Sequence, residues 1–181
     1  MFWSCGEPSC YKEAIQMKDS VKWEQAMQSE YNSIIANETW ELTKLPQGKQ
    51  DLPCKWVYKK KYTAKDLEPK YKPRLVAKGF KQKKGIDFNE IFSPVVKMTT
   101  LCLVLEIVAT EDLELIQMDV KTAFLHEDLD EDVYMKQPEG FALEFPKLSR
   151  VELVCRLRKA LYGLKQGSRQ WYLKFDKYMQ S

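Results

Sequence analysis

The sequence predicts a single α+β domain, and three observations support this class. First, 181 residues with 44% apolar side chains are enough for one domain with its own core. Second, segments with the alternating pattern of strands are mixed along the chain with segments that have helical spacing. Third, no linker-like composition separates two bodies, so strands and helices are expected to share one core.

Helical spacing is clearest over residues 21–36, where Ser20 can act as the N-terminal cap. Large side chains recur on one face of this helix: Trp23, Met27, Tyr31 and Ile34. Residues 40–45 alternate like a short strand, and a turn follows at 46–48. The pattern indicates a helix with one apolar face followed by a strand.

Residues 55–62 and 70–80 are predicted to form two strands joined by a polar turn at 65–69, which makes a strongly basic β-hairpin. Pro73 is awkward in the second strand, because proline has no N–H for a ladder and belongs at an edge or a bulge. Three aromatic side chains of the hairpin could stack on nucleic-acid bases or pack into the core: Trp56, Tyr58 and Tyr71.

The remaining chain alternates between helices and strands. The expected elements are a buried helix over 100–110 capped by Thr99, a strand ending at Asp119, a short helical or turn segment through Leu125, strands over 133–136 and 151–157, and a helix from about Ser168 to Met179. The last helix carries apolar side chains four residues apart at Trp171, Phe175 and Met179. The longest apolar run, residues 101–109, is interrupted by Glu106 and is too short to span a bilayer.

The net charge of +3 conceals two strongly charged blocks. Residues 55–84 hold twelve Lys or Arg and two acidic residues, a local charge of +10, whereas residues 106–132 have a local charge of −9. Such blocks favour a partner with phosphates, together with an acidic region that binds metal or is solvated. The alternative is that both blocks are solvated faces of one fold.

Cysteine and histidine usage excludes a zinc site of ordinary spacing. The five cysteines form no Cys-x-x-Cys pair, and His126 is the single histidine. The odd number and wide spacing of the cysteines favour free thiols in a reducing, intracellular compartment. The N-terminus lacks the basic region and the long apolar core of a signal peptide.

Residues 115–124 carry the strongest indication of chemistry. An apolar, strand-like run delivers the carboxylate of Asp119 to its end, and Ala123 and the aromatic Phe124 follow. A nucleotide polymerase needs a carboxylate that holds Mg²⁺, then a bulky side chain beside the sugar of the incoming nucleotide. The alternatives are an aspartate that caps a turn after a strand, and a core phenylalanine.

Lys72, Arg74 and Lys78 occupy alternate positions of one predicted strand, so their side chains are expected on the same face. Three cations on one face suit a triphosphate or a template backbone, and arginine can grip phosphate oxygens bidentately. The alternative is a solvated face of the hairpin.

Four sequence blocks together resemble the reverse transcriptase of copia-type long-terminal-repeat retrotransposons. They are Lys55-Trp56-Val57-Tyr58-Lys59, Arg74-Leu75-Val76-Ala77-Lys78-Gly79-Phe80, Met118-Asp119-Val120-Lys121-Thr122-Ala123-Phe124-Leu125-His126 and Leu161-Tyr162-Gly163-Leu164-Lys165-Gln166. Segments at 92–97 and 133–138 lie between them in the family's order. The resemblance covers roughly residues 11 to 181.

The resemblance implies a right-hand polymerase fold of the reverse transcriptase type. Residues 1–12 would be a lead-in, residues 13–98 mainly fingers, and residues 99–181 a partial palm. The family extends a DNA primer with deoxynucleotides on an RNA or DNA template, with Mg²⁺ as cofactor. The resemblance also places the chain in the cytoplasm, a virus-like particle or the nucleus, without a membrane partner.

The resemblance assigns roles to individual residues. Asp119 would be the catalytic carboxylate and first metal ligand, and the carbonyl of Val120 an additional ligand. Phe124 would be a steric gate at the nucleotide that leaves no room for a ribose hydroxyl. The other nucleotide-binding residues would be Lys72, Arg74, Lys78 and Gln166, and the template-binding residues Gly163 and Lys165.

The family supplies its remaining carboxylates from a Tyr-Val-Asp-Asp hairpin, whereas this chain contains no Asp-Asp dipeptide. One carboxylate cannot hold two Mg²⁺ ions in fixed geometry. The chain is therefore expected to be a fragment truncated before that hairpin, and inactive by itself. The alternatives are a nucleic-acid-binding module without catalysis and a transposon fragment without function.

Overall fold

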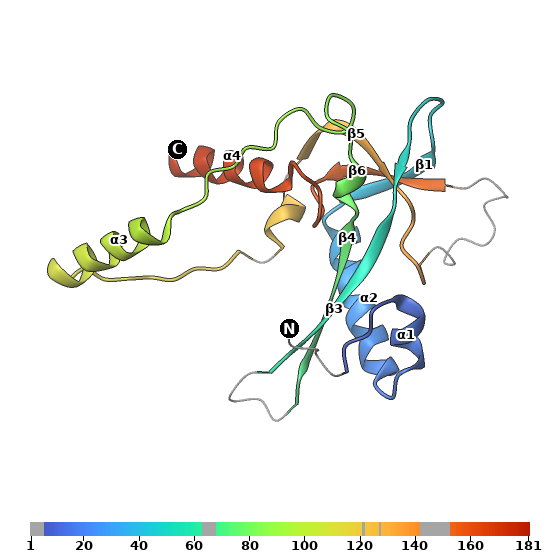
Figure 1. Cartoon of the computed structure of the whole chain (residues 1–181), viewed down its shortest axis with the longest axis horizontal. Helices are drawn as coiled ribbons and strands as arrows, with labels where there is room; N and C mark the ends of the chain where they lie inside the picture. Colours follow the sequence, from blue (N-terminus) through green and yellow to red (C-terminus); the bar gives the residue numbers. More distant parts are fainter. Residues whose placement is uncertain (1–5, 63–67, 121, 127, 142–152) are drawn as a thin grey trace.

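The computed structural model describes residues 6–62, 68–120, 122–126, 128–141 and 153–181, and it confirms a mixed α+β architecture (Figure 1). The helices are α1 (Tyr11–Gln16), α2 (Ser20–Ala36), α3 (Met98–Thr110) and α4 (Gly167–Met179), with 3-10 turns η1 (Gly79–Lys81) and η2 (Ala123–His126). The strands are β1 (Trp40–Lys44), β2 (Asp51–Leu52), β3 (Cys54–Lys61), β4 (Lys70–Ala77), β5 (Asp128–Met135) and β6 (Leu153–Lys159). Parts of three predicted segments lie outside the described residues: 1–5, 65–67 and 151–152.

Two sheets form the frame of the molecule. The larger sheet has the strand order β1-β6-β5-β2, in which β2 and β5 run parallel and the other neighbours antiparallel. Strands β3 and β4 form a separate antiparallel hairpin, which confirms the predicted basic hairpin. The hairpin extends away from the larger sheet, with α1 and α2 beside it (Figure 1).

Helix α2 packs against β4 through the apolar face that the sequence predicted, although Asp19 precedes the helix and Ser20 is its first residue. Trp23 is fully buried, and the rings of Tyr58 and Tyr71 meet it edge to face at centroid distances of 5.1 and 4.7 Å. Trp56 is also buried. Burial therefore makes Trp56 and Tyr58 core residues and excludes the other interpretation, stacking on nucleic-acid bases.

Pro73 lies within β4, opposite Tyr58, without interrupting the hairpin ladder. The amide of Ala77 points away from β3, because it donates to the carbonyl of Tyr162 at 2.8 Å. N–H groups alternate in direction along a strand, so Pro73, four residues earlier, also faces the outer edge. The missing N–H of proline therefore costs no hydrogen bond with β3.

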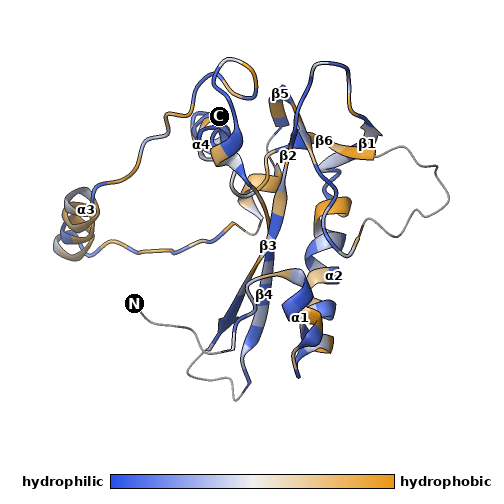
Figure 2. Cartoon of the chain, turned by 45° about the vertical axis from the view of Figure 1, so that its right-hand side comes forward, coloured by the Kyte–Doolittle hydropathy of each residue, from blue (hydrophilic) through white to orange (hydrophobic). Residues whose placement is uncertain are grey.

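Residues 94–120, called the apolar arm, extend away from the other described residues, called the body (Figure 1). The predicted helix is present as α3, but it buries no side chain, so the expectation of a buried helix is wrong. The predicted strand ending at Asp119 is also wrong, because residues 113–120 are exposed and belong to no strand. An apolar helix or strand is buried only where another layer covers it, and the described residues provide no such layer here. Figure 2 shows hydrophobic residues along α3 at the edge of the molecule.

Helix α4 has nearly the predicted bounds, but its apolar stripe is not buried, since Phe175 and Met179 are 48% and 65% exposed. Gly167 and Gln170 are buried instead, in the first turn, which is the end of α4 nearest the rest of the body. None of the helices in the part of the chain that the structure describes is long and apolar enough to cross a membrane.

Candidate functional site

The end of β4 is joined to the segment 160–166 that follows β6. Ala77 donates its amide to the Tyr162 carbonyl at 2.8 Å, and Gly163 adopts a φ of 90°. A Cβ on Gly163 would lie 2.2 Å from the carbonyl oxygen of Ala77, so this close approach requires glycine. The contact brings the basic hairpin and the C-terminal part of the chain into one site.

Arg74, Tyr162 and Phe124 form a stack at this junction. The guanidinium of Arg74 lies over the Tyr162 ring, 5.2 Å from its centroid. The Tyr162 ring in turn meets Phe124 edge to face at 5.1 Å. Two aromatic rings and one guanidinium group are therefore in contact in a row. Such a row suits a ligand that is planar or carries negative charge. Two predicted nucleotide-binding residues, Arg74 and Phe124, are thus brought together.

Lys72 lies on the same face of β4 as Arg74, two residues away. Partial burial lowers the pKa of the Lys72 ammonium, and the positive charges of Arg74 and Lys61 lower it further. Glu30 and Asp119 act in the opposite direction, so both carboxylates lie within electrostatic range of this lysine. Lys72 and Arg74 are therefore neighbours on one face, whereas the charge of Asp119 is the smallest of these contributions to the pKa of Lys72.

Sequence reasoning missed two residues of this site, Tyr162 and Glu30. Tyr162 lies in a quoted block, but nothing in the sequence indicates that its ring meets Arg74. Glu30 lies on α2, where burial raises the pKa of its carboxyl and the charges of Arg74 and Lys72 oppose that rise. Glu30 lies three residues after Met27, on the apolar face of the helix, and this position could have indicated from the sequence that its carboxyl is partly buried.

Asp119 and Val120 lie at the end of the apolar arm and are exposed. Within the described ranges, no group of three or more His, Cys, Asp or Glu side chains is arranged to hold a metal ion. Mg²⁺ requires several oxygen ligands in near-octahedral geometry, and Asp119 contributes one carboxylate. The described residues by themselves therefore do not fit the predicted metal centre.

Lys78 does not continue the face of Lys72 and Arg74, because β4 ends at Ala77 and the backbone turns into η1. It lines a different cavity of about 220 Å³, whose walls include Tyr11, Trp56 and Leu75. The expectation that three cations share one face is therefore wrong for Lys78.

Gln166 is 1% exposed, and its amide is occupied by partners within the protein. Gln166 therefore has a structural role at the junction, and its nucleotide-binding role stays a prediction. The Lys165 ammonium lies 4.7 Å from the centroid of the Phe88 ring and 3.3 Å from the carbonyl of Gln82. The template-binding roles of Gly163 and Lys165 stay predictions.

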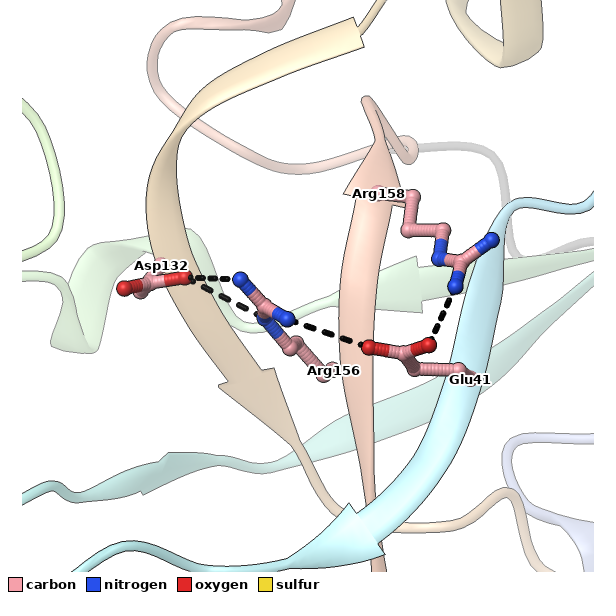
Figure 3. Close-up of polar contacts among 4 residues, drawn as sticks. All are labelled: Glu41, Asp132, Arg156 and Arg158. Atoms are coloured by element: carbon pink, nitrogen blue, oxygen red, sulfur yellow. Dashed lines mark hydrogen bonds and ion pairs between the residues drawn. The ribbon is translucent and has the colours of Figure 1, made fainter.

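A second cluster of charges crosses three strands of the larger sheet (Figure 3). Arg156 on β6 donates to Asp132 on β5 at 2.8 Å and to Glu41 on β1 at 3.1 Å, and Arg158 also donates to Glu41. The Arg158 guanidinium, helped by Arg156, holds the pKa of the Glu41 carboxyl below its usual range. Because carboxylates already match these cations, the cluster joins strands and is a poor phosphate site.

A comparison with known protein families identifies the family of this chain. Residues 37–181 match the family described as reverse transcriptase (RNA-dependent DNA polymerase). The chain belongs to the reverse transcriptase family. Members of this family generally use a divalent metal ion. No solved structure matches this reverse transcriptase chain.

Three relatives of this reverse transcriptase chain come from retrotransposons of plants and yeast. It is 53% identical over 175 residues to the retrovirus-related Pol polyprotein from transposon TNT 1-94 of Nicotiana tabacum. It is 43% identical over 167 residues to that from transposon RE1 of Arabidopsis thaliana, and 27% identical over 173 residues to the transposon Ty1-BL Gag-Pol polyprotein of Saccharomyces cerevisiae. The alignments cover 97%, 92% and 93% of the chain, but 13%, 11% and 10% of these relatives.

Proposed function

We propose that this chain supplies the fingers and part of the palm of an RNA-directed DNA polymerase within a longer Pol polypeptide. Residues 13–98 are mainly fingers in this proposal, and residues 99–181 belong to the palm of a right-hand fold. The observation that carries the proposal is the stack of Arg74, Tyr162 and Phe124, because it gathers side chains from both parts. The family match over residues 37–181 supports it independently.

Each residue of the stack has a defined task in this proposal. Arg74, with Lys72 beside it, binds the phosphates of the incoming deoxynucleotide. Phe124 lies against the sugar at C2′ and excludes a ribose hydroxyl by repulsion. Asp119 supplies one carboxylate for the metal ion in this proposal. A complete Mg²⁺ site needs further carboxylates from elsewhere in a longer polypeptide.

The apolar arm supports the view that such a polymerase is assembled with additional polypeptide. Large apolar side chains on α3, such as Leu103 at 56% and Val104 at 49%, are exposed. The segment 113–120 pairs with no strand among the described residues. An active palm would have to cover both, so the chain by itself is proposed to be inactive.

Primer extension tests this function. The chain is to replace the matching segment of the tobacco Pol polyprotein, and the chimera is assayed on an RNA template with Mg²⁺ and deoxynucleotides. The chimera is expected to extend the primer, and Asp119→Asn to reduce the rate roughly 1000-fold, because a metal ligand is lost. The isolated chain is the control and should show no extension. A folded chimera without activity would contradict the proposal.

The gate assignment has a separate test in the same chimera. Phe124→Ala is expected to increase incorporation of ribonucleotides relative to deoxynucleotides, because the space beside C2′ opens. Phe175→Ala, on the exposed part of α4, is the matched control and should leave the ratio unchanged. Unchanged discrimination in Phe124→Ala would remove the gate role from this residue.

A nucleic-acid-binding module without catalysis is the second candidate, and the hairpin register favours it. Lys59 lies directly opposite Lys72, and Lys61 opposite Lys70. Like charges in this position repel across a sheet, although Lys59 also pairs with Glu7 at 2.9 Å, and a polyanion would reduce the repulsion. Binding of single-stranded RNA by the isolated chain, weakening steeply with salt, would support this candidate.

A further inference from the structure

The side chains of Gln82 and Gln166 are buried at the junction between the hairpin and the C-terminal part of the chain. Gln82 follows η1 and is 5% exposed, and Gln166 directly precedes α4 and is 1% exposed. A buried amide must find both donors and acceptors, because unpaired polar groups are costly away from water. The hydrogen-bond partners of these two amides therefore show which segments they connect.

The two glutamines form one connected network. Gln82 donates through Nε2 to Oε1 of Gln166 at 3.0 Å, and accepts at Oε1 from the backbone amide of Lys165 at 2.9 Å. Gln166 donates through Nε2 to the carbonyl of Asp87 at 3.0 Å. The ammonium of Lys165 also reaches the carbonyl of Gln82 at 3.3 Å. Both ends of the Gln82 amide are thus used to hold the segment before α4.

The backbone at this place tolerates little movement. A Cβ on Gly79 would lie 2.0 Å from the carbonyl oxygen of Gly163 and 3.0 Å from Oε1 of Gln82. The hydrogen bond from Ala77 to the carbonyl of Tyr162 lies one residue before Gly163. The end of β4 and the segment 161–166 are therefore fixed to one another on both sides of the glycine contact.

We propose that Gln82 is a positioning residue of the nucleotide site. Its amide fixes the segment 161–166, and this segment carries the Tyr162 ring that contacts both Arg74 and Phe124. Gln82 touches no nucleotide in this inference, and it acts through Lys165 and Gln166. The inference rests on the proposed function, because it concerns the geometry of the same site.

The chemistry of the amide makes the role testable. Glutamate at this position could accept from the amide of Lys165, but when ionised it could not donate to Oε1 of Gln166. Methionine keeps a similar volume and does neither. The variants Gln82→Glu and Gln82→Met therefore remove one hydrogen bond and two hydrogen bonds, respectively, with little change in packing volume.

The experiment uses the tobacco chimera and measures KM for a deoxynucleotide and kcat separately. Gln82→Met is expected to raise KM about tenfold and change kcat less than about threefold, because the stack that receives the nucleotide shifts while the chemistry is retained. Gln82→Glu should give a smaller rise. Gln137→Met is the matched control: it removes a partly buried amide that donates to the carbonyl of Leu153 at 2.8 Å, and KM should stay within about twofold.

A purely structural role gives a different result, since loss of folded protein lowers apparent kcat and leaves KM unchanged. That outcome, or equal KM values in Gln82→Met and Gln137→Met, would overturn the inference. Should Gln82→Met fail to fold by circular dichroism, Gln82→Glu decides the matter: a raised KM supports the inference and an unchanged KM overturns it. A wild-type chimera without primer extension would instead remove the proposed function and, with it, the site to be positioned.

Discussion

The body and the apolar arm each contain a helix with large apolar side chains, yet the surroundings of the two helices differ completely. In α2, Trp23, Met27 and Ile34 are at most 1% exposed, and both β4 and α1 pack against this helix. In α3, Leu101 and Ile107 are 45% and 48% exposed, although the helix itself is complete. Helix formation follows the local sequence, whereas burial depends on a partner layer, which the described residues supply to α2 and not to α3.

The composition of α3 is typical of a helix that is buried on several sides. Apolar side chains surround much of the helix, and an amphipathic surface helix would carry a polar face. The body, by contrast, mixes a buried face with an outer face of lysines on the hairpin. The arm therefore has apolar surface on several sides, whereas the body has apolar side chains mainly on its inner faces.

Thiol reactivity should show the largest difference. Cys155 is buried in the body, where burial raises its pKa to about 12, whereas Cys102 is exposed on α3. Because the thiolate is the reactive form, iodoacetamide should modify Cys102 roughly 1000-fold faster than Cys155 at pH 8. Peptide mass spectrometry over time measures both rates, with the chain in guanidinium as a control in which they converge. Similar rates in the native chain would show that the body is not packed as described.

Trp23→Ala should cause the largest loss of stability. Trp23 is fully buried and contacts the rings of Tyr58 and Tyr71, so its removal should cost about 3–5 kcal/mol in the free energy of unfolding. Urea denaturation followed by circular dichroism measures the change. A loss below about 1 kcal/mol would mean that α2 does not anchor the hairpin.

Gly163→Ala tests the junction inside the body. An added Cβ would lie 2.2 Å from the carbonyl oxygen of Ala77, so the cost should be about 2–3 kcal/mol. Gly48→Ala is the control, because Gly48 also has positive φ but nothing lies within 4 Å of its Cβ position. It should cost about 1 kcal/mol from backbone strain alone. Equal losses of stability would contradict the close approach.

Glu41→Gln should have a smaller effect that depends on pH. The Arg158 guanidinium depresses the folded-state pKa of Glu41, so the stabilisation is present above the ordinary glutamate pKa and is lost as the pH falls through the folded value. Melting curves should therefore separate the variant from the parent at pH 7 and approach one another as the pH falls below the ordinary glutamate pKa. Glu24→Gln on exposed α2 surface is the control. A difference that does not shrink as the pH is lowered would contradict the ionic cause.

Leu103→Ala should have the smallest effect in the isolated chain, below about 0.5 kcal/mol, because the side chain is 56% exposed. In the tobacco chimera the same change should cost about 2–4 kcal/mol if additional polypeptide covers α3. Urea denaturation of both proteins measures the contrast. A small effect in both would mean that the arm is exposed in the longer protein as well.

Local patterns in the sequence predicted α2 and the hairpin of the body, but they missed α1 and β2 and gave only residues 133–136 of β5. The spacing of Trp23, Met27 and Ile34 identified α2 and its buried face, and the alternation in residues 55–80 identified the hairpin. The same patterns gave α3 its bounds to within two residues but assigned it to the core, because periodicity reports which side chains favour burial and not what covers them.

The candidate site was predicted in part. Arg74 and Phe124 were identified from motif order, but the Tyr162 ring that joins them was not, since its contacts come from segments far apart in the chain. Gln166 was assigned to the nucleotide because an amide can contact a base or sugar, whereas the structure uses that amide to pair with Gln82. Which partner a polar group finds is a tertiary property, and short motifs do not contain it.

Pro73 interrupts the outer edge of β4, where Tyr71 and Leu75 on either side direct their N–H groups outward. An additional strand from another molecule would need an unbroken row of donors on this edge. The hairpin is therefore a poor template for edge-to-edge pairing between copies of the chain. Its lysine-rich face stays accessible, and the most highly charged part of the molecule is also protected against β-type self-association.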